Sequence, residues 1–147
     1  MKIRYFLCSV AALLTTFSVY AATDRYMIEA EAFQFKGKWF SERSADCMGS
    51  SMLRLGGGGS LDVQYDALTA VDILEAGEYN VWVRSADYEQ HQGTRRFRLS
   101  INEQPMEESG AHGKAGWYWE NVGKICLKKG QALFRLHDTN RNYGRCD

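Results

Sequence analysis

The sequence predicts an all-β fold, an antiparallel β-sandwich or jelly roll, from three observations. Polar and apolar residues alternate with a period of two along 77–84 and again along 95–101, where Phe97, Leu99 and Ile101 share one face. Glycine, asparagine and proline turn signals separate the apolar segments. No stretch of the chain has the 3.6-residue period of a convincing amphipathic helix. Eight or nine short strands in roughly 125 residues are typical of a sandwich.

The expected strands follow from this alternation, and the expected turns lie between them. Strands are predicted over 26–31, 51–55, 61–65, 70–74, 77–84, 95–101, 117–122, 124–127 and 132–137. Turns are predicted over 56–60, 75–77, 102–105 and 128–130. The glycine run at 56–59 is interpreted as a hairpin loop, because a nucleotide-binding glycine loop needs a helix after it and 60–65 alternates like a strand.

The N-terminus has the pattern of a secretory signal peptide over residues 1–22. Lys2 and Arg4 precede an apolar run that ends at small residues, and the run is shorter than the roughly 20 apolar residues of a spanning helix. The alternative, a single membrane anchor, is less favoured because the run contains serine and threonine. We therefore expect a secreted or periplasmic protein whose mature part, residues 23–147, does not stay in the membrane.

Charge argues against one class of partner. Eighteen Lys and Arg balance 18 Asp and Glu in the whole chain, and removal of Lys2 and Arg4 leaves 16 basic residues against 18 acidic ones. A nucleic-acid-binding protein uses a net positive field to find a polyanion. We therefore expect no nucleic-acid partner.

Three cysteines lie outside the expected signal peptide, at Cys47, Cys126 and Cys146. Export permits disulfides, and an odd number of cysteines allows at most one bridge within the chain. We expect that bridge between Cys126 and Cys146, which both lie in the C-terminal third. Zinc binding is disfavoured because no Cys-x-x-Cys pair occurs and no histidine lies at ligand spacing from a cysteine.

Several motifs resemble known modules. The segment 28–33, followed by Lys38 and Trp39, resembles the opening strand of calcium-dependent jelly-roll carbohydrate-binding modules. The motifs at 48–50, 77–84, 97–99, 116–119, 136–138 and 144–147 resemble, in the same order, the N-terminal β-sandwich module found ahead of an FAD-dependent oxidoreductase domain in secreted bacterial proteins.

That resemblance has two implications for the organisation of the protein. In the family, the motif at 144–147 continues into a closing strand, so the resemblance implies that 23–147 lacks its final strand. It also implies that oxidoreductase chemistry, and FAD, belong to a downstream region absent from this chain.

A calcium site is expected at Glu29 and Glu31. Residues two apart on a strand project to the same face, and paired carboxylates suit a hard cation. The resemblance adds an acidic residue near the end of the domain, for which Asp147 or Asp138 is available. The alternative is a solvated strand face. Calcium here would fasten the first strand, a structural role, and would not take part in chemistry.

Sugar binding needs exposed aromatic rings, because a pyranose presents an apolar C–H face to them. Trp117 and Trp119 share one face of an expected strand and are the main candidates, with Tyr88 and Trp39 as further ones. Core packing is the alternative for the two main candidates. A contact between Trp82 and Arg84 is interpreted separately, as a cation–π pair on one sheet face.

Catalysis by this chain is disfavoured. His137 and Asp138 are adjacent on an expected strand and so point to opposite faces, while Glu107 and Glu108 are placed in a charged loop. No catalytic motif of a known type occurs. The sequence favours a non-catalytic accessory module that binds a polysaccharide or glycan, with a structural or docking domain of a larger FAD-dependent oxidoreductase as the alternative.

Overall fold

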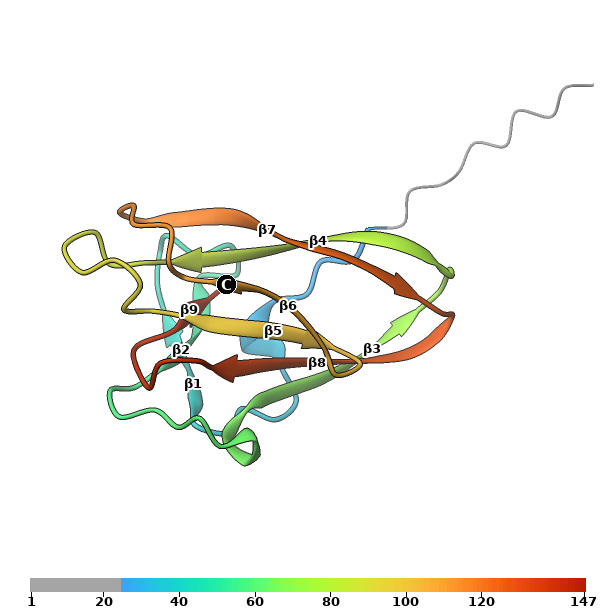
Figure 1. Cartoon of the computed structure of the whole chain (residues 1–147), viewed down its shortest axis with the longest axis horizontal. Coiled ribbons are helices and arrows are strands. Elements are labelled where there is room, and N and C mark those ends of the chain that lie inside the picture. Colours follow the sequence, from blue (N-terminus) through green and yellow to red (C-terminus); the bar gives the residue numbers. More distant parts are fainter. Residues whose placement is uncertain (1–24) are drawn as a thin grey trace, which may run out of the picture.

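Two antiparallel sheets face each other in the computed structural model, which describes residues 25–147 (Figure 1). The predicted all-β class is confirmed. Within those residues no helix has the length and apolarity needed to cross a bilayer. The expected signal peptide, residues 1–22, lies outside the described residues.

The two sheets contain all nine strands of the described chain. One sheet has the order β1 (Trp39–Arg43), β2 (Ser51–Leu55), β9 (Arg145–Cys146), β4 (Gly77–Ala86) and β7 (Trp117–Leu127). The other has the order β3 (Ala67–Ile73), β8 (Gly130–Asp138), β5 (Phe97–Ile101) and β6 (Gln104–Ser109).

The hydrophobic core lies between the sheets and follows the predicted alternation. Val81 and Val83 of β4 point inward, as do Phe97 and Leu99 of β5, and all four are buried. Trp39 closes the core from β1, with its ring centroid 5.7 Å from that of Phe97 in an edge-to-face contact. Burial of these alternating faces is what makes the two-layer arrangement stable.

Two predicted strands are wrong. The segment 26–31 is irregular and ends in a 3₁₀ turn, η1 (Ala30–Ala32), and 61–65 ends in another, η2 (Val63–Tyr65). The second turn forms because the Asp62 carboxylate accepts a hydrogen bond from the Gln64 amide at 3.1 Å, which caps the turn. The glycine run at 56–59 is therefore a loop, as predicted, but no hairpin forms around it.

Other differences have a local cause. The segments 117–122 and 124–127 form one strand, β7, which carries a bulge where the register with β4 shifts and where Gly123 has a φ of +119°. Strands β1, β6 and β9 were not predicted. β6 contains Pro105, which a sheet tolerates here because β6 is an edge strand.

Strand β9 has only two residues but a central place. Cys146 pairs with Leu53 of β2 on one side and with Ser85 of β4 on the other. The ladder continues to the Asp147 amide, which donates to the Arg84 carbonyl at 3.0 Å. Beyond it, Val81–Val83 have no ladder partner on that side among the described residues, and a cavity of about 920 Å³ opens there between the sheets.

Candidate functional site

A pocket of about 660 Å³ is lined by residues of the loop after β4 and of the loop between β8 and β9. These two loops lie at the same end of the sandwich (Figure 1, left). Its walls come from three separate stretches of chain. The lining residues are Arg54, Tyr88, His91, Thr94, Arg95, Asn142, Tyr143 and Arg145. Concave sites at the ends of β-sheets, built from loops on a rigid scaffold, are common places for ligand binding.

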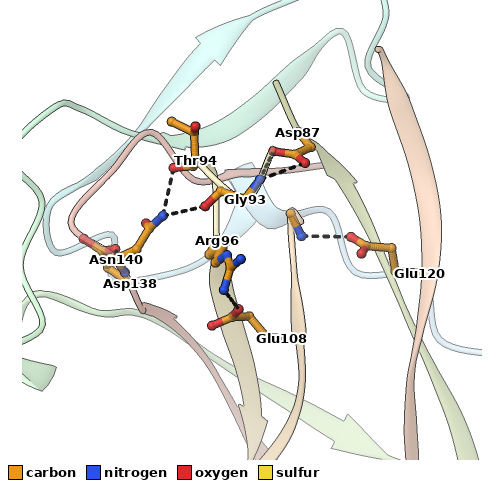
Figure 2. A network of polar contacts seen from close by, with 9 residues as sticks. Asp87, Gly93, Thr94, Arg96, Glu108, Glu120, Asp138 and Asn140 are labelled. Carbon is orange, nitrogen blue, oxygen red and sulfur yellow. Dashed lines mark hydrogen bonds and ion pairs between the residues drawn. The ribbon is translucent and has the colours of Figure 1, made fainter. Parts of the chain in front are cut away.

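A buried carboxylate fixes the first of these loops. Asp87 is almost fully buried, and its carboxylate accepts hydrogen bonds from the amides of Gly93 at 3.1 Å and Gly113 at 2.7 Å (Figure 2 shows the Gly93 contact). The Asp87 carbonyl accepts a hydrogen bond from Arg95 at 2.8 Å. Asp87 therefore holds the loop after β4 against the loop between β6 and β7.

A second buried carboxylate fixes the loop on the other side of the pocket. Asp138 accepts hydrogen bonds from the amides of Asn140 at 3.1 Å and Arg141 at 2.8 Å. The Asn140 side chain then donates to the carbonyls of Gly93 at 2.9 Å and Thr94 at 3.0 Å (Figure 2). These bonds join the two loops that line the pocket, so its shape is set before any ligand arrives.

Gly59 lies against the same carboxylate. A Cβ atom at this position would be 2.1 Å from Asp138 Oδ2, so no other residue fits without displacing the carboxylate. The glycine run predicted as a loop thus has a packing role beside the pocket.

Arginine dominates the charge of the pocket. Burial, followed by the neighbouring guanidinium of Arg145, lowers the pKa of Arg95, and burial, followed by Arg54, lowers the pKa of Arg145. Arg54 pairs with Glu42 at 2.6 Å. Arg145 is half-buried, its Nε is buried without a hydrogen-bond partner, and the Glu42 carboxylate partly offsets the lowering of its pKa.

Two tyrosines supply exposed aromatic surface in the pocket. Tyr88 is 40% exposed and Tyr143 is 44% exposed. The Arg95 guanidinium lies 5.3 Å from the Tyr88 ring centroid. The sequence pointed to Tyr88 but not to Tyr143 or the arginines, because nothing in the local pattern shows that positions 54, 95 and 145 meet.

The predicted tryptophans lie elsewhere, on the outer face of the sheet that contains β4 and β7. Trp119 is 47% exposed and Trp82, from the neighbouring strand, is 54% exposed. Arg84 stacks on Trp117, at 5.2 Å from its ring centroid, and not on Trp82 as predicted. Trp39 is 3% exposed in the core, so its prediction as a ligand-binding residue is wrong.

The predicted calcium ligands converge only in part. A Cβ atom at Gly49 would lie 2.9 Å from Glu29 Oε2 and 2.7 Å from Glu31 Oε1, so both carboxylates cover the same glycine although neither is on a strand. Ser51 donates to Glu31 Oε1 at 3.1 Å, and Glu31 Oε2 is buried without a partner. That orphaned oxygen fits a cation.

The proposed third ligand is engaged otherwise. Asp147 accepts from the Met48 amide at 3.0 Å and forms an ion pair with Arg84, while the hydrogen bonds of Asp138 lie within the loop after β8. Within residues 25–147, no group of three or more acidic, histidine or cysteine side chains is arranged for a metal ion. The fit to calcium thus rests on Glu29 and Glu31.

The predicted Cys126–Cys146 disulfide is wrong. Cys126 is exposed on β7 and Cys146 is buried in the core, and both are free, as is Cys47. The alternation of strand side chains puts the two predicted partners on different faces of their sheet. Burial raises the pKa of Cys47 and raises that of Cys146 to about 12.

The residues considered for catalysis form contacts with other residues of the fold. His137 contacts Asp66 at 2.8 Å and not Asp138, and Arg135 completes an ion pair with Asp66 at 3.3 Å. Glu107 and Glu108 lie on β6 and not in a loop, and Glu108 pairs with Arg96 at 3.2 Å (Figure 2). None of these residues lines the pocket.

Comparisons with known proteins place the fold. No protein-family model matches the chain, and no curated protein sequence matches it. Among solved structures, a family 35 carbohydrate-binding module from Clostridium thermocellum superposes with a TM-score of 0.63 at 19% identity, over 82% of this chain and 93% of that one.

Larger proteins contain the same fold. A Podospora anserina GH26-CBM35 β-(1,4)-mannanase matches with a TM-score of 0.64 at 16% identity, over 82% of this chain and 25% of its own. A Paenibacillus xanthan lyase matches with a TM-score of 0.62 at 21% identity, over 81% of this chain and 12% of its own. The chain therefore has the β-sandwich fold that is found in family 35 carbohydrate-binding modules.

Proposed function

We propose that this chain binds carbohydrate, without catalysing a reaction, in the pocket at the loop end of the sandwich. The observation that carries the proposal is a preformed concave site in which two exposed tyrosines, Tyr88 and Tyr143, stand among hydrogen-bonding side chains. A sugar ring stacks on such aromatic faces while its hydroxyls bond to the polar groups around them.

The lining of the pocket supports binding without catalysis. Glycoside hydrolysis uses a pair of carboxylic groups on either side of the bond that is cleaved. The pocket lining contains no aspartate or glutamate. A binding role needs no such pair.

The setting of the module is also part of the proposal. The similar structures support carbohydrate binding through their fold, and the chain matches about a quarter of the length of the mannanase. An exported accessory module, placed beside a catalytic region such as an FAD-dependent oxidoreductase domain, fits both this match and the pattern of residues 1–22. A docking domain is the alternative, and the exposed pair Trp82 and Trp119 favours it.

Binding of polysaccharides in native affinity gels tests the proposal. Tyr88→Ala is expected to weaken retention at least about tenfold, as loss of an aromatic anchor does. Trp119→Ala is the matched control, since it removes an exposed aromatic from the other surface. Loss of retention in Trp119→Ala alone would move the sugar site to the sheet face, and no retention of the unaltered protein on any polysaccharide would favour docking.

We further propose that Glu29 and Glu31 hold a structural calcium ion. Calcium binding to the native state would raise the melting temperature, by an amount equivalent to about 2.7 kcal/mol at one hundred times its Kd. After treatment with a chelator, calcium is expected to raise the melting temperature of the unaltered protein and of Glu107→Gln, but not of Glu31→Gln. If added calcium leaves the melting temperature of the unaltered protein unchanged, the result would contradict the proposed calcium site.

A further inference from the structure

We infer that this module accepts an added β-strand from another polypeptide, beside β4. The site is the part of the cavity of about 920 Å³ that is lined by Val81–Val83, which we call the β4 groove. Its occupant is an extended segment that runs antiparallel to β4 and carries apolar side chains at every second position. This inference goes beyond the proposed function, since it concerns protein binding outside the loop-end pocket.

Strand β9 shows that β4 takes a partner on this side. Cys146 pairs with Ser85, and the Asp147 amide donates to the Arg84 carbonyl at 3.0 Å. In an antiparallel ladder, every second residue directs its N–H and C=O groups to the same neighbour. The next such groups along β4 belong to Trp82, and they have no ladder partner on this side within the described chain. The β4 groove therefore continues a ladder that β9 begins.

The alternation of side chains gives the pattern that an added strand must have. Cys146 belongs to the core cluster, so the next residue, Asp147, points to the outer face of the sheet. Residues of an added strand that lie opposite the buried Val83 and Val81 would face the core, and the residue between them would lie outside, beside the exposed Trp82. The occupant therefore alternates between inward and outward side chains in the register that β9 sets.

The inner side of the β4 groove is apolar. Four buried side chains of the opposite sheet line the cavity there: Leu99 and Ile101 of β5, and Phe134 and Leu136 of β8. Removal of apolar surface from water stabilises a bound segment, whereas a charged side chain placed here would lose its hydration. The lining therefore selects apolar residues at the inward positions.

The segment 25–29 forms another wall of the cavity and has the features of a strand without a partner. Tyr26 and Ile28 are half-buried against the core, whereas the residues on either side of each are exposed. The segment lines the same cavity but belongs to no ladder within the described chain. An added strand offers backbone groups on both its sides, to β4 on one and to this segment on the other.

Synthetic peptides test the inference on the unaltered protein. The probe is a capped peptide, Lys-Val-Thr-Val-Thr-Val-Lys, in which valines occupy the inward positions and β-branched side chains favour a strand. One control peptide has the same composition with the valines placed together. The other replaces both threonines by proline, which removes the N–H donors that would face β4.

Hydrogen exchange of the Trp82 amide is the main measurement, because an added strand would cover this amide. At ten times its Kd, the alternating peptide is expected to slow this exchange about tenfold and to raise the melting temperature. Neither control peptide is expected to change either quantity.

Two variants tie the binding to the backbone of β4. Trp82→Pro removes the amide that faces the β4 groove, while the β7 ladder uses the neighbouring residues, so the variant is expected to fold. It is expected to bind the alternating peptide at least about tenfold more weakly. Trp82→Ala, the matched control, keeps the amide and is expected to keep the binding.

The other occupants of the β4 groove give different results. Equal protection of the Trp82 amide by the alternating peptide and by either control would overturn the inference. Protection that rises with protein concentration in the absence of peptide would assign the groove to a second copy of the chain. Protection by dodecanoate, but not by the alternating peptide, would assign it to an apolar small molecule.

The same peptide separates this inference from the proposed function. Retention on a polysaccharide, and its loss in Tyr88→Ala, are expected to be the same with and without the alternating peptide. A protein that binds no polysaccharide but binds the peptide would contradict the proposed function alone, and the reverse result would overturn strand addition alone.

Discussion

The pKa of the Cys146 thiol depends on the burial of this side chain in the core. Cys146 lies on a strand of two residues, faces the core cluster, and burial raises its pKa from 9.0 to about 12. Below about pH 9 the thiol is protonated in both the folded and the unfolded chain. Between about pH 9 and pH 12 only the unfolded chain releases the proton, so the stability that this thiol contributes falls as the pH rises.

The first prediction concerns this pH dependence. The free energy of unfolding is expected to fall by about 1.4 kcal/mol more between pH 8 and pH 10 in the unaltered protein than in Cys146→Ala. Urea denaturation at each pH measures the difference, with Cys126→Ala, at an exposed cysteine, as control. Equal slopes for the unaltered protein and Cys146→Ala would contradict the burial of this thiol.

The exposure of a side chain could be predicted from the sequence only where the local pattern decides it. Tyr88 lies in a loop, and its partial exposure agrees with its choice as a candidate. Trp39 is buried because β1 faces Phe97 across the sandwich, a contact that spans distant parts of the chain. The Cys126–Cys146 pairing failed for the same reason, since the face of each strand depends on its place in the sheet.

At the scale of elements, the pocket depends on bonds between two loops. Asn140 donates to two carbonyls of the loop after β4, and its own amide is held by Asp138. The strands on either side are held by regular ladders, whereas these loops are held by single side chains. The loops are therefore the elements whose order a single substitution can change.

The second prediction follows from those two bonds. Asn140→Ala leaves the carbonyls of Gly93 and Thr94 without their donor, which costs about 1–3 kcal/mol if they stay buried. Hydrogen exchange of the amides in 88–96 is expected to accelerate while that of β5 stays unchanged. Asn80→Ala, at an exposed position on β4, is the control. Exchange as slow as in the unaltered protein would show that the loop order does not depend on Asn140.

Strands were predicted correctly where polar and apolar residues alternate regularly. They were predicted incorrectly where this alternation is interrupted. The bulge at Gly123 and the proline in β6 both interrupt a ladder, and the sequence pattern places a break at each. Only the neighbouring strand decides whether such a break ends a strand or bends it. The two 3₁₀ turns were mistaken for strands because their residues also alternate.

For the whole molecule, β9 joins two parts of one sheet. It is the hydrogen-bonded connection between β1–β2 and β4–β7, through Cys146 and its pairs Leu53 and Ser85. The residues that pair here lie far apart in the sequence. The sandwich therefore forms cooperatively or not at all, because neither half of the sheet has a complete core.

The third prediction tests this dependence. A chain that ends at Gly144 lacks β9 and is expected to lose its near-ultraviolet circular dichroism and its cooperative thermal transition. Asp147→Asn keeps β9 and is expected to keep both, although its ion pair with Arg84 is removed. A cooperative transition in the shortened chain would show that the ladder through β9 is dispensable.

The fold as a whole could be predicted because alternation recurs along most of the chain, whereas the site could not. Arg54, Arg95 and Arg145 each look like an ordinary surface residue in their own segment. Their meeting depends on the sheet order that puts β9 between β2 and β4. The pocket is therefore a property of the topology.

That order also leaves part of β4 uncovered. Val81–Val83 lack a ladder partner beside the end of β9, within the described chain, where the cavity between the sheets opens. Backbone donors and acceptors next to apolar side chains accept an added strand from any extended polypeptide. This stretch of β4 is therefore the place in its sheet where an extended segment can add without displacing a strand of the described chain.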